Sequence, residues 1–218
     1  MAPEDVRVSA CPYAGLAARG GKGQTRGPTP VDGGGREFFM KAQRILVVYY
    51  SRTGMTRLLA NMLADELDCT LEELTDLRPR HGVFGFVSRG IDGALERRTA
   101  LGPVREDPTG FDLVIIATPV WNRSVCSAVR TYLTEQRGRC RKVAFALAQS
   151  SVGRSRVFQQ MEDLSGLTPI TTLAVTESDF LRGGYRRKVS RFAARIRAEH
   201  AGQPMLQEPE HGLDDAFV

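Results

Sequence analysis

The sequence predicts an α/β protein built on a doubly wound parallel sheet. Short runs of apolar and β-branched residues, each typical of a strand buried on both faces, recur along the chain. Segments with apolar residues at helical spacing separate these runs. Five such strands favour a parallel sheet with helices on both faces. Because parallel crossovers are right-handed, the strand order 2-1-3-4-5 is the simplest arrangement.

The first half of the predicted domain contains two strands and one helix. The first strand is expected over residues 44–50, which read RILVVYY. A second and weaker strand is expected over residues 70–74. The helix between them is marked by apolar residues at helical spacing, namely Leu58, Leu59, Met62, Leu63 and Leu67.

The second half repeats the alternation. Strands are expected over residues 111–117, 142–148 and 170–175. A helix follows each of them, and the last helix has apolar residues at positions i, i+3, i+4 and i+7. These are Val189, Phe192, Ala193 and Ile196.

The chain of 218 residues divides into three expected regions. Residues 1–40 contain eight glycines and four prolines, so they cannot bury enough surface to offset their ordering entropy. They are either a disordered leader or the product of a mis-assigned start, with Met40 as the true beginning. Residues 41–200 form the predicted domain. Residues 201–218 carry four acids and no Lys or Arg, which predicts a disordered acidic tail.

Charge and cysteine usage narrow the function classes. The whole chain is +5, residues 1–40 are +1 and the tail is −4, which leaves +8 on residues 41–200. This favours anionic partners such as phosphorylated cofactors or acidic proteins, although a solvated surface is the alternative. No motif predicts nucleic-acid binding, and no apolar run is long enough to span a membrane. The scattered cysteines predict a cytoplasmic protein without a metal site: Cys11, Cys69, Cys126 and Cys140.

The loop after the first strand is a candidate phosphate site, because ligands of doubly wound sheets bind beyond the carboxyl ends of the strands. Hydroxyl groups there can donate to phosphate oxygens, a glycine allows close approach of the backbone, and a helix N-terminus follows. The pattern is neither a Walker loop nor GxGxxG. The alternative is a helix cap without a ligand. The loop reads Ser51-Arg52-Thr53-Gly54-Met55-Thr56.

Two further loops are candidates for holding a flat ring. The loop predicted over residues 118–124 contains Trp121, the only tryptophan of the chain, together with Pro119. Trp121 can stack on a ring system, or it can form a lid over apolar surface. The loop after the fourth strand offers backbone N–H and C=O groups to a ring edge. It reads Gln149-Ser150-Ser151-Val152-Gly153.

These segments resemble the flavodoxin family over residues 44–198. Residues 51–56 fit its phosphate-loop pattern [ST]-x-T-G-x-T, and residues 111–121 resemble its third strand and ring-binding loop. The resemblance implies a five-stranded flavodoxin-like sheet and noncovalently bound FMN. The flavin would carry the chemistry, so no catalytic side chain is expected. The implied cofactor-binding residues are Ser51, Arg52, Thr53, Gly54, Met55, Thr56, Pro119, Val120, Trp121, Asn122, Gln149, Ser150, Ser151 and Gly153.

The favoured function is an FMN-dependent oxidoreductase that moves hydride or electrons to a quinone-like or other small acceptor. NAD(P)H is a candidate electron donor. The alternatives are a flavodoxin that carries electrons to redox proteins and a flavin-free protein of the same fold. Carrier flavodoxins are acidic as a family, so the charge of +8 argues against the carrier. A basic cluster on the last helix is either a solvated face or a docking site for an acidic partner or nicotinamide phosphates: Arg186, Arg187, Lys188 and Arg191.

Overall fold

A parallel sheet forms the centre of the molecule. The computed structural model describes residues 44–77, 98–149 and 153–200. Five parallel strands have the order β2-β1-β3-β5-β6, which is 2-1-3-4-5 when they are counted along the chain, as predicted. A short sixth strand, β4 (Ser124–Val125), pairs antiparallel with β3. The parallel strands are β1 (Ile45–Tyr49), β2 (Thr70–Glu73), β3 (Leu113–Trp121), β5 (Val143–Gln149) and β6 (Thr172–Thr176).

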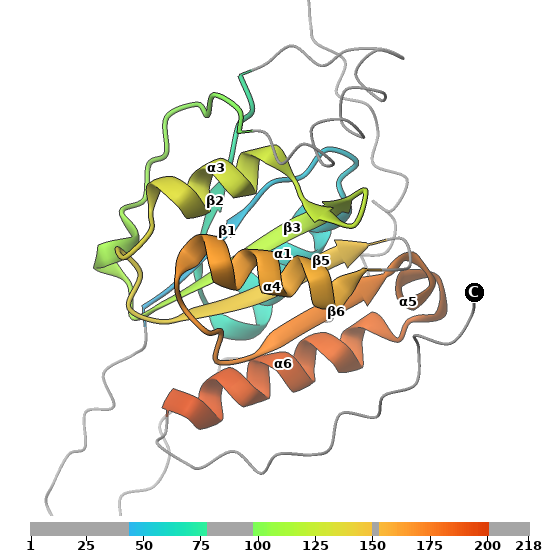
Figure 1. Cartoon of the computed structure of the whole chain (residues 1–218). Coiled ribbons are helices and arrows are strands. Elements are labelled where there is room, and N and C mark those ends of the chain that lie inside the picture. Colours follow the sequence, from blue (N-terminus) through green and yellow to red (C-terminus); the bar gives the residue numbers. More distant parts are fainter. Residues whose placement is uncertain (1–43, 78–97, 150–152, 201–218) are drawn as a thin grey trace, which may run out of the picture.

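Helices cover both faces of this sheet (Figure 1). α1 (Met55–Leu67) and α6 (Tyr185–His200) pack on one face, and α3 (Ser127–Glu135) and α4 (Arg154–Ser165) pack on the other. The short helix α5 (Glu177–Arg182) lies beyond the end of β6, and a 3₁₀ turn, η2 (Pro108–Gly110), precedes β3.

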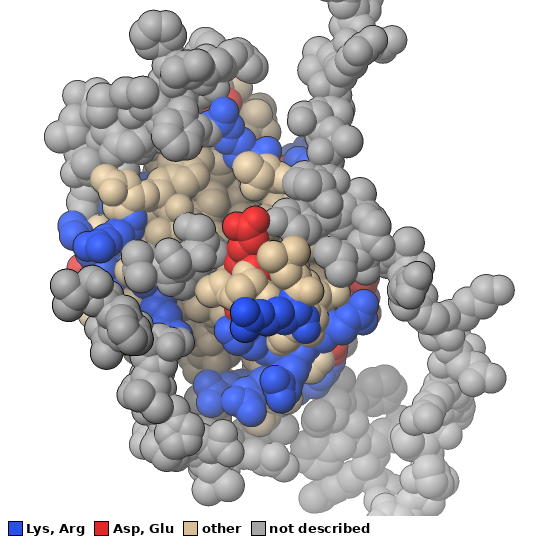
Figure 2. Space-filling model, turned by 90° about the vertical axis from the view of Figure 1, so that its right-hand side faces the viewer, with Lys and Arg blue, Asp and Glu red and all other residues tan. Residues whose placement is uncertain are grey.

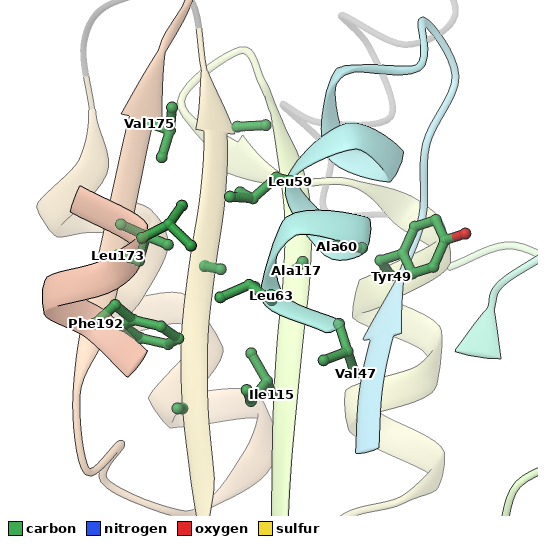
Figure 3. Packing of buried hydrophobic residues seen from close by; sticks show 14 of the residues in the cluster. Val47, Tyr49, Leu59, Ala60, Leu63, Ile115, Ala117, Leu173, Val175 and Phe192 are labelled. Atoms are coloured by element: carbon green, nitrogen blue, oxygen red, sulfur yellow. The ribbon is translucent and has the colours of Figure 1, made fainter. Parts of the chain in front are cut away.

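Two apolar clusters hold the layers together, because successive residues of a strand point to opposite faces of the sheet. Val47 and Ile115 face α1 and α6, where they pack with Leu63 (Figure 3). Leu46 and Val114 face α3 and α4. All five side chains are fully buried, and each contributes about 1.5–3 kcal/mol by leaving water.

Two parts of the fold differ from the sequence prediction. β3 continues four residues past its expected end at Ala117, so Pro119 and Trp121 lie in a strand instead of a loop. Pro119 follows the last residue of β3 that pairs with β1 and precedes the first that pairs with β4, a place where a missing N–H is tolerated. Helix α5 was not expected, because it is only six residues long and buries a single apolar residue, Phe180.

Candidate functional site

The candidate site lies at the carboxyl ends of β1, β3 and β5. The chain leaves β1 toward α1 on one face and leaves β3 toward α3 on the other. The boundary between β1 and β3 is therefore the switch point of the sheet, where ligands of doubly wound folds bind.

The loop after β1 presents several unused polar groups. The Ser51 Oγ atom is buried and makes no hydrogen bond within the described residues. Gly54 precedes α1 with a φ of 91°, a left-handed conformation that favours glycine. The first hydrogen bond of the helix runs from Leu58 N–H to Gly54 C=O at 2.9 Å. The N–H groups of Met55, Thr56 and Arg57 therefore lack acceptors within the helix.

No side chain of this loop caps α1 in the described structure. A cap needs a side-chain oxygen that accepts from the first turn of the helix. In the described structure neither Ser51 nor Thr53 does so, and the N-cap position is the glycine. Arg52 and Thr53 are exposed, whereas Thr56 is buried in the first turn. A buried hydroxyl, a left-handed glycine and an uncapped helix together fit the phosphate of a mononucleotide.

A side-chain network fixes the start of α1 against the edge strand. Arg57 forms two hydrogen bonds with the Glu73 carboxylate, at 2.6 and 3.1 Å, and Tyr49 Oη donates to the same carboxylate at 3.1 Å. Burial, together with the charge of Glu73, raises the pKa of Tyr49 to about 12. The phenol therefore keeps its proton at neutral pH, and the bidentate ion pair holds the helix in place.

The predicted loop over residues 118–124 is a β-hairpin. Val120 pairs with Val125 and Trp121 with Ser124, which leaves Asn122 and Arg123 as a two-residue turn. Both turn residues have positive φ, at 48° and 57°. Two central residues with positive φ define a type I′ turn, whose twist matches that of the strands. The hairpin thus presents its residues on a rigid element.

Trp121 has an aromatic neighbour from another strand end. The ring of Tyr50, the residue directly after β1, lies 5.6 Å from the Trp121 ring at an interplanar angle of 88°. This is the favourable edge-to-face arrangement. Both side chains are half-buried and pack against the α3–α4 side of the core. Trp121 is therefore only partly accessible, and its buried part covers apolar surface.

The start of α4 meets the hairpin. Gln149 is the last residue of β5, and Gly153 begins α4 with a φ of 98°. A Cβ atom at Gly153 would lie 3.0 Å from both Cβ and Cγ of Arg123. The glycine therefore allows the hairpin turn to approach the start of α4. Ser150 and Ser151 lie outside the described residues.

A buried polar cluster fastens the hairpin to the two helices beneath it. Gln160 Oε1, from α4, accepts hydrogen bonds from Ser124 Oγ at 3.0 Å and from Val125 N–H at 3.1 Å. Arg130, from α3 and almost fully buried, donates to Ser124 Oγ at 2.9 Å. These contacts position β4, and through β4 the residues of the predicted ring site.

A cavity of about 780 Å³ opens on the β2 side of the same loop. Tyr50 and Ser51 reach its wall, but the described lining contains no residue of the hairpin and neither Gln149 nor Gly153. The remaining lining is mostly polar and includes Glu72, Asp76 and Arg105. The cavity therefore adjoins the candidate phosphate loop and lies apart from the hairpin.

Thiol and metal chemistry find no support in the described ranges. Burial raises the pKa of Cys69, Cys126 and Cys140 to about 11 in each case, so none is a reactive thiolate at neutral pH. No group of three or more His, Cys, Asp or Glu side chains there is arranged to hold a metal ion. No helix there is long and apolar enough to cross a membrane.

The structure adds site residues that the sequence analysis missed. Tyr50 could have been found, since it is an aromatic residue directly before the phosphate loop. Arg130 and Gln160 lie within helical patterns and leave no local signal of their own. Their shared contact with Ser124 appears only when α3, α4 and β4 come together.

Solved structures of flavoproteins are similar to this chain. A flavoprotein from Lactobacillus acidophilus NCFM in complex with FMN is 20% identical, with a TM-score of 0.53 over 65% of this chain and 98% of its own. A candidate flavoprotein from Bacteroides uniformis ATCC 8492 is 18% identical, with a TM-score of 0.56 over 71% of this chain and 99% of its own.

A further candidate flavoprotein, from Bacteroides eggerthii DSM 20697, is 17% identical, with a TM-score of 0.55 over 67% of this chain and 98% of its own. No protein-family model matches the chain. No curated protein matches it either. Identities of this size establish shared architecture, so the chain has the flavodoxin-like fold of these flavoproteins.

Proposed function

We propose that this chain binds FMN noncovalently at the carboxyl end of its sheet and acts as an FMN-dependent oxidoreductase. The observation that carries the proposal is the Ser51 Oγ atom, a buried hydroxyl without a partner beside the uncapped start of α1. A phosphate at this position would accept hydrogen bonds from the hydroxyl and from the helix N–H groups. It would thereby remove the cost of burying an unpaired polar group.

The proposed position of the phosphate beside Ser51 assigns roles to the other predicted cofactor-binding residues. Ser51, Arg52, Thr53, Gly54, Met55 and Thr56 would surround the phosphate. Pro119, Val120, Trp121 and Asn122 would flank one side of the ring, and Gln149, Ser150, Ser151 and Gly153 would line the other edge. Bound FMN would supply the hydride and electron chemistry. The chain binds and orients it, and the acceptor we propose is a quinone-like or other small molecule.

The cofactor is tested by comparing FMN with riboflavin, which lacks the phosphate. Titrations that follow the quenching of flavin fluorescence give both dissociation constants. We expect FMN to bind at least about 100-fold more tightly, a difference of ~2.7 kcal/mol. Equal affinities, or failure to retain FMN after removal of the excess, would contradict the phosphate site.

The reaction is tested on the flavin-loaded protein under nitrogen. After reduction with dithionite, the flavin is expected to be reoxidised by the quinone menadione at a rate that saturates with quinone concentration, as binding of the acceptor requires. NADH and NADPH are compared as donors in the same apparatus. A rate that rises linearly with quinone and never saturates would remove the small-acceptor assignment while leaving FMN binding intact.

A further inference from the structure

The outer face of α6 carries a row of arginines. Arg187, Arg191 and Arg195 follow one another at intervals of four residues and are all exposed. This spacing places them on one side of the helix, opposite the buried Val189 and Ile196. We call these three arginines the basic stripe.

The basic stripe works against the stability of its own helix. Like charges four residues apart destabilise a helix by about 0.2–0.5 kcal/mol per pair. The first turn of α6 contains Arg187 and no acidic residue, although the positive end of the helix dipole favours acids there. Nearby cations do find partners, since Lys188 pairs with Asp179 at 2.8 Å and Arg197 with Glu66 at 3.6 Å.

None of the three stripe arginines forms an ion pair in the described ranges. Natural proteins break one or two such local preferences at functional sites. The repulsion within the stripe would be relieved by an anionic partner.

An exposed apolar side chain lies in α5, the helix that precedes α6. Leu181, in α5, is 72% exposed, and Arg182 follows it. Figure 2 views the molecule from the end at which the strands finish, and Lys and Arg gather in its lower half, at the level of α5 and the start of α6. An exposed apolar residue beside arginines is typical of a protein interface. The aromatic residues of α5 and the start of α6, Phe180 and Tyr185, are 0% and 3% exposed and cannot stack on nucleic-acid bases.

The Leu181 end of this surface lies close to the proposed flavin site. Gln149, at the end of β5, pairs directly with Thr176, and α5 begins at the next residue. Neighbouring strands are about 4.8 Å apart, and a six-residue helix is about 9 Å long. Leu181 is therefore on the order of 15 Å from Gln149 at most. A protein seated on Leu181 would lie beside the flavin.

We propose that Leu181 and the basic stripe form the docking surface for an acidic redox protein that donates electrons to the flavin. The inference rests on the proposed FMN function and adds the electron donor to it. In each encounter the reduced one-electron centre of the partner loses one electron and the flavin gains it. Two encounters, with two protons from water, reduce FMN to FMNH2, which the small acceptor then reoxidises.

The test uses an acidic plant-type [2Fe–2S] ferredoxin as the probe, since such proteins are one-electron donors of low potential. Stopped-flow absorbance measures the rate constant for reduction of the flavin-loaded full chain at low ionic strength. The stripe variant is Arg187→Gln, Arg191→Gln, Arg195→Gln. We expect it to lower the rate constant about tenfold, with the loss fading as salt is added.

The control variant removes three positive charges from the opposite end of the sheet, just before β5: Arg137→Gln, Arg139→Gln, Arg141→Gln. Two of these arginines form exposed ion pairs, with Asp107 and Asp112, so the loss of stability is small. We expect its rate constant to stay within about twofold of the wild-type value. An equal fall in both variants would overturn the docking surface, because net charge alone would then explain it.

A second readout separates this inference from the proposed function. Oxidised ferredoxin is titrated by calorimetry into the full chain without flavin, with the same two variants. Affinity that falls only in the stripe variant supports the docking surface even where FMN is not retained. Stronger stripe-dependent binding of a 20-nucleotide DNA than of ferredoxin would overturn it in favour of a nucleic acid.

The chain itself offers one competing occupant, its acidic carboxyl-terminal segment. A full-length variant with amides at four positions removes that charge: Glu208→Gln, Glu210→Gln, Asp214→Asn and Asp215→Asn. We expect ferredoxin affinity to change by less than about twofold. A tenfold increase would overturn the inference, because it would assign the stripe to the segment of this chain.

Discussion

The two ends of the sheet differ in whether side chains cap the helix starts and pair with one another. At the amino end, the Asp112 carboxylate accepts from the Arg44 N–H at 3.1 Å and forms an ion pair with Arg141 at 3.5 Å. Also at that end, the Asp107 carboxylate caps η2 and pairs with Arg139 at 2.9 Å. At the carboxyl end of the described structure, α1 and α4 both begin at left-handed glycines without a side-chain cap. Among the described residues, buried hydroxyls without a partner occur at both ends, Ser51 Oγ at the carboxyl end and Thr171 Oγ1 at the amino end.

A position at the carboxyl end of the sheet does not by itself prevent a side chain from capping a helix. Helix α5 also starts at the carboxyl end, yet Thr176 and Asp179 form a complete capping box there. A side-chain cap is worth about 1 kcal/mol, and an unpaired buried polar group costs about 1–3 kcal/mol. The starts of α1 and α4 therefore forgo stability that the same fold obtains elsewhere. Sites that bind ligands commonly show this exchange of stability for function.

The largest expected effect comes from placing a negative charge in the phosphate loop. Thr53→Glu, at an exposed position, should weaken FMN binding by about 100-fold or more, because a carboxylate about 5 Å from a phosphate is strongly repelled. Fluorescence titration with FMN measures the loss. Thr70→Glu adds the same charge at the exposed start of β2 and should leave the affinity within about twofold. Equal losses of FMN affinity in the two variants would contradict a phosphate site at the carboxyl end of the sheet.

A smaller effect is expected where the hairpin meets α4. Gly153→Ala combines a left-handed backbone with the contact at Arg123, so it should lower the free energy of unfolding by about 2–3 kcal/mol. Gly138→Ala has a φ of 77° but open space around it, and should cost only about 1 kcal/mol. Urea unfolding compares them. Identical costs would mean that the approach of Arg123 to Gly153 contributes nothing.

The smallest effect concerns the capped helix. Burial raises the pKa of Asp179, but hydrogen bonds from Lys188 and Thr176 outweigh it and hold that pKa below its usual range. The stabilisation is therefore present above the unfolded pKa of about 3.9 and is lost as pH falls through the folded pKa.

Asp179→Asn should be less stable than wild type by less than about 1 kcal/mol at pH 6, and the gap should close toward pH 2. Urea unfolding as a function of pH measures it. A gap that does not change with pH would show that the ionised carboxylate adds nothing to the capping box.

The sheet and its order were predictable because each strand is buried on both faces. Runs such as Ile45–Tyr49 have few other stable arrangements than a central parallel strand. The loop between β1 and α1 could be located because its hydroxyls and glycine are contiguous in the sequence, but its role in binding phosphate stays a prediction. FMN and the site residues themselves stay predictions.

The hairpin was not predictable from local pattern. Pro119 and Asn122 usually signal a loop, and pairing with the two-residue strand β4 overrides that signal. The approach of Arg123 to Gly153 and the cluster around Gln160 join residues about 30 positions apart. Such contacts depend on how the layers pack, which periodicity does not specify. Helix α5 was not predicted because it is marked by a capping box and has no apolar face that periodicity could detect.

Ser51→Ala tests most directly the claim that Ser51 donates a hydrogen bond to the FMN phosphate. That claim predicts that the variant gains stability without FMN and loses affinity for FMN. Without FMN, removing a buried and unpaired hydroxyl should raise the free energy of unfolding by about 1 kcal/mol; with FMN, affinity should fall about 10-fold to 100-fold. Thr171→Val removes a similar unpaired hydroxyl at the amino end of β6 and should stabilise without changing affinity. A Ser51→Ala protein that is more stable and binds FMN as tightly as wild type would contradict the phosphate site.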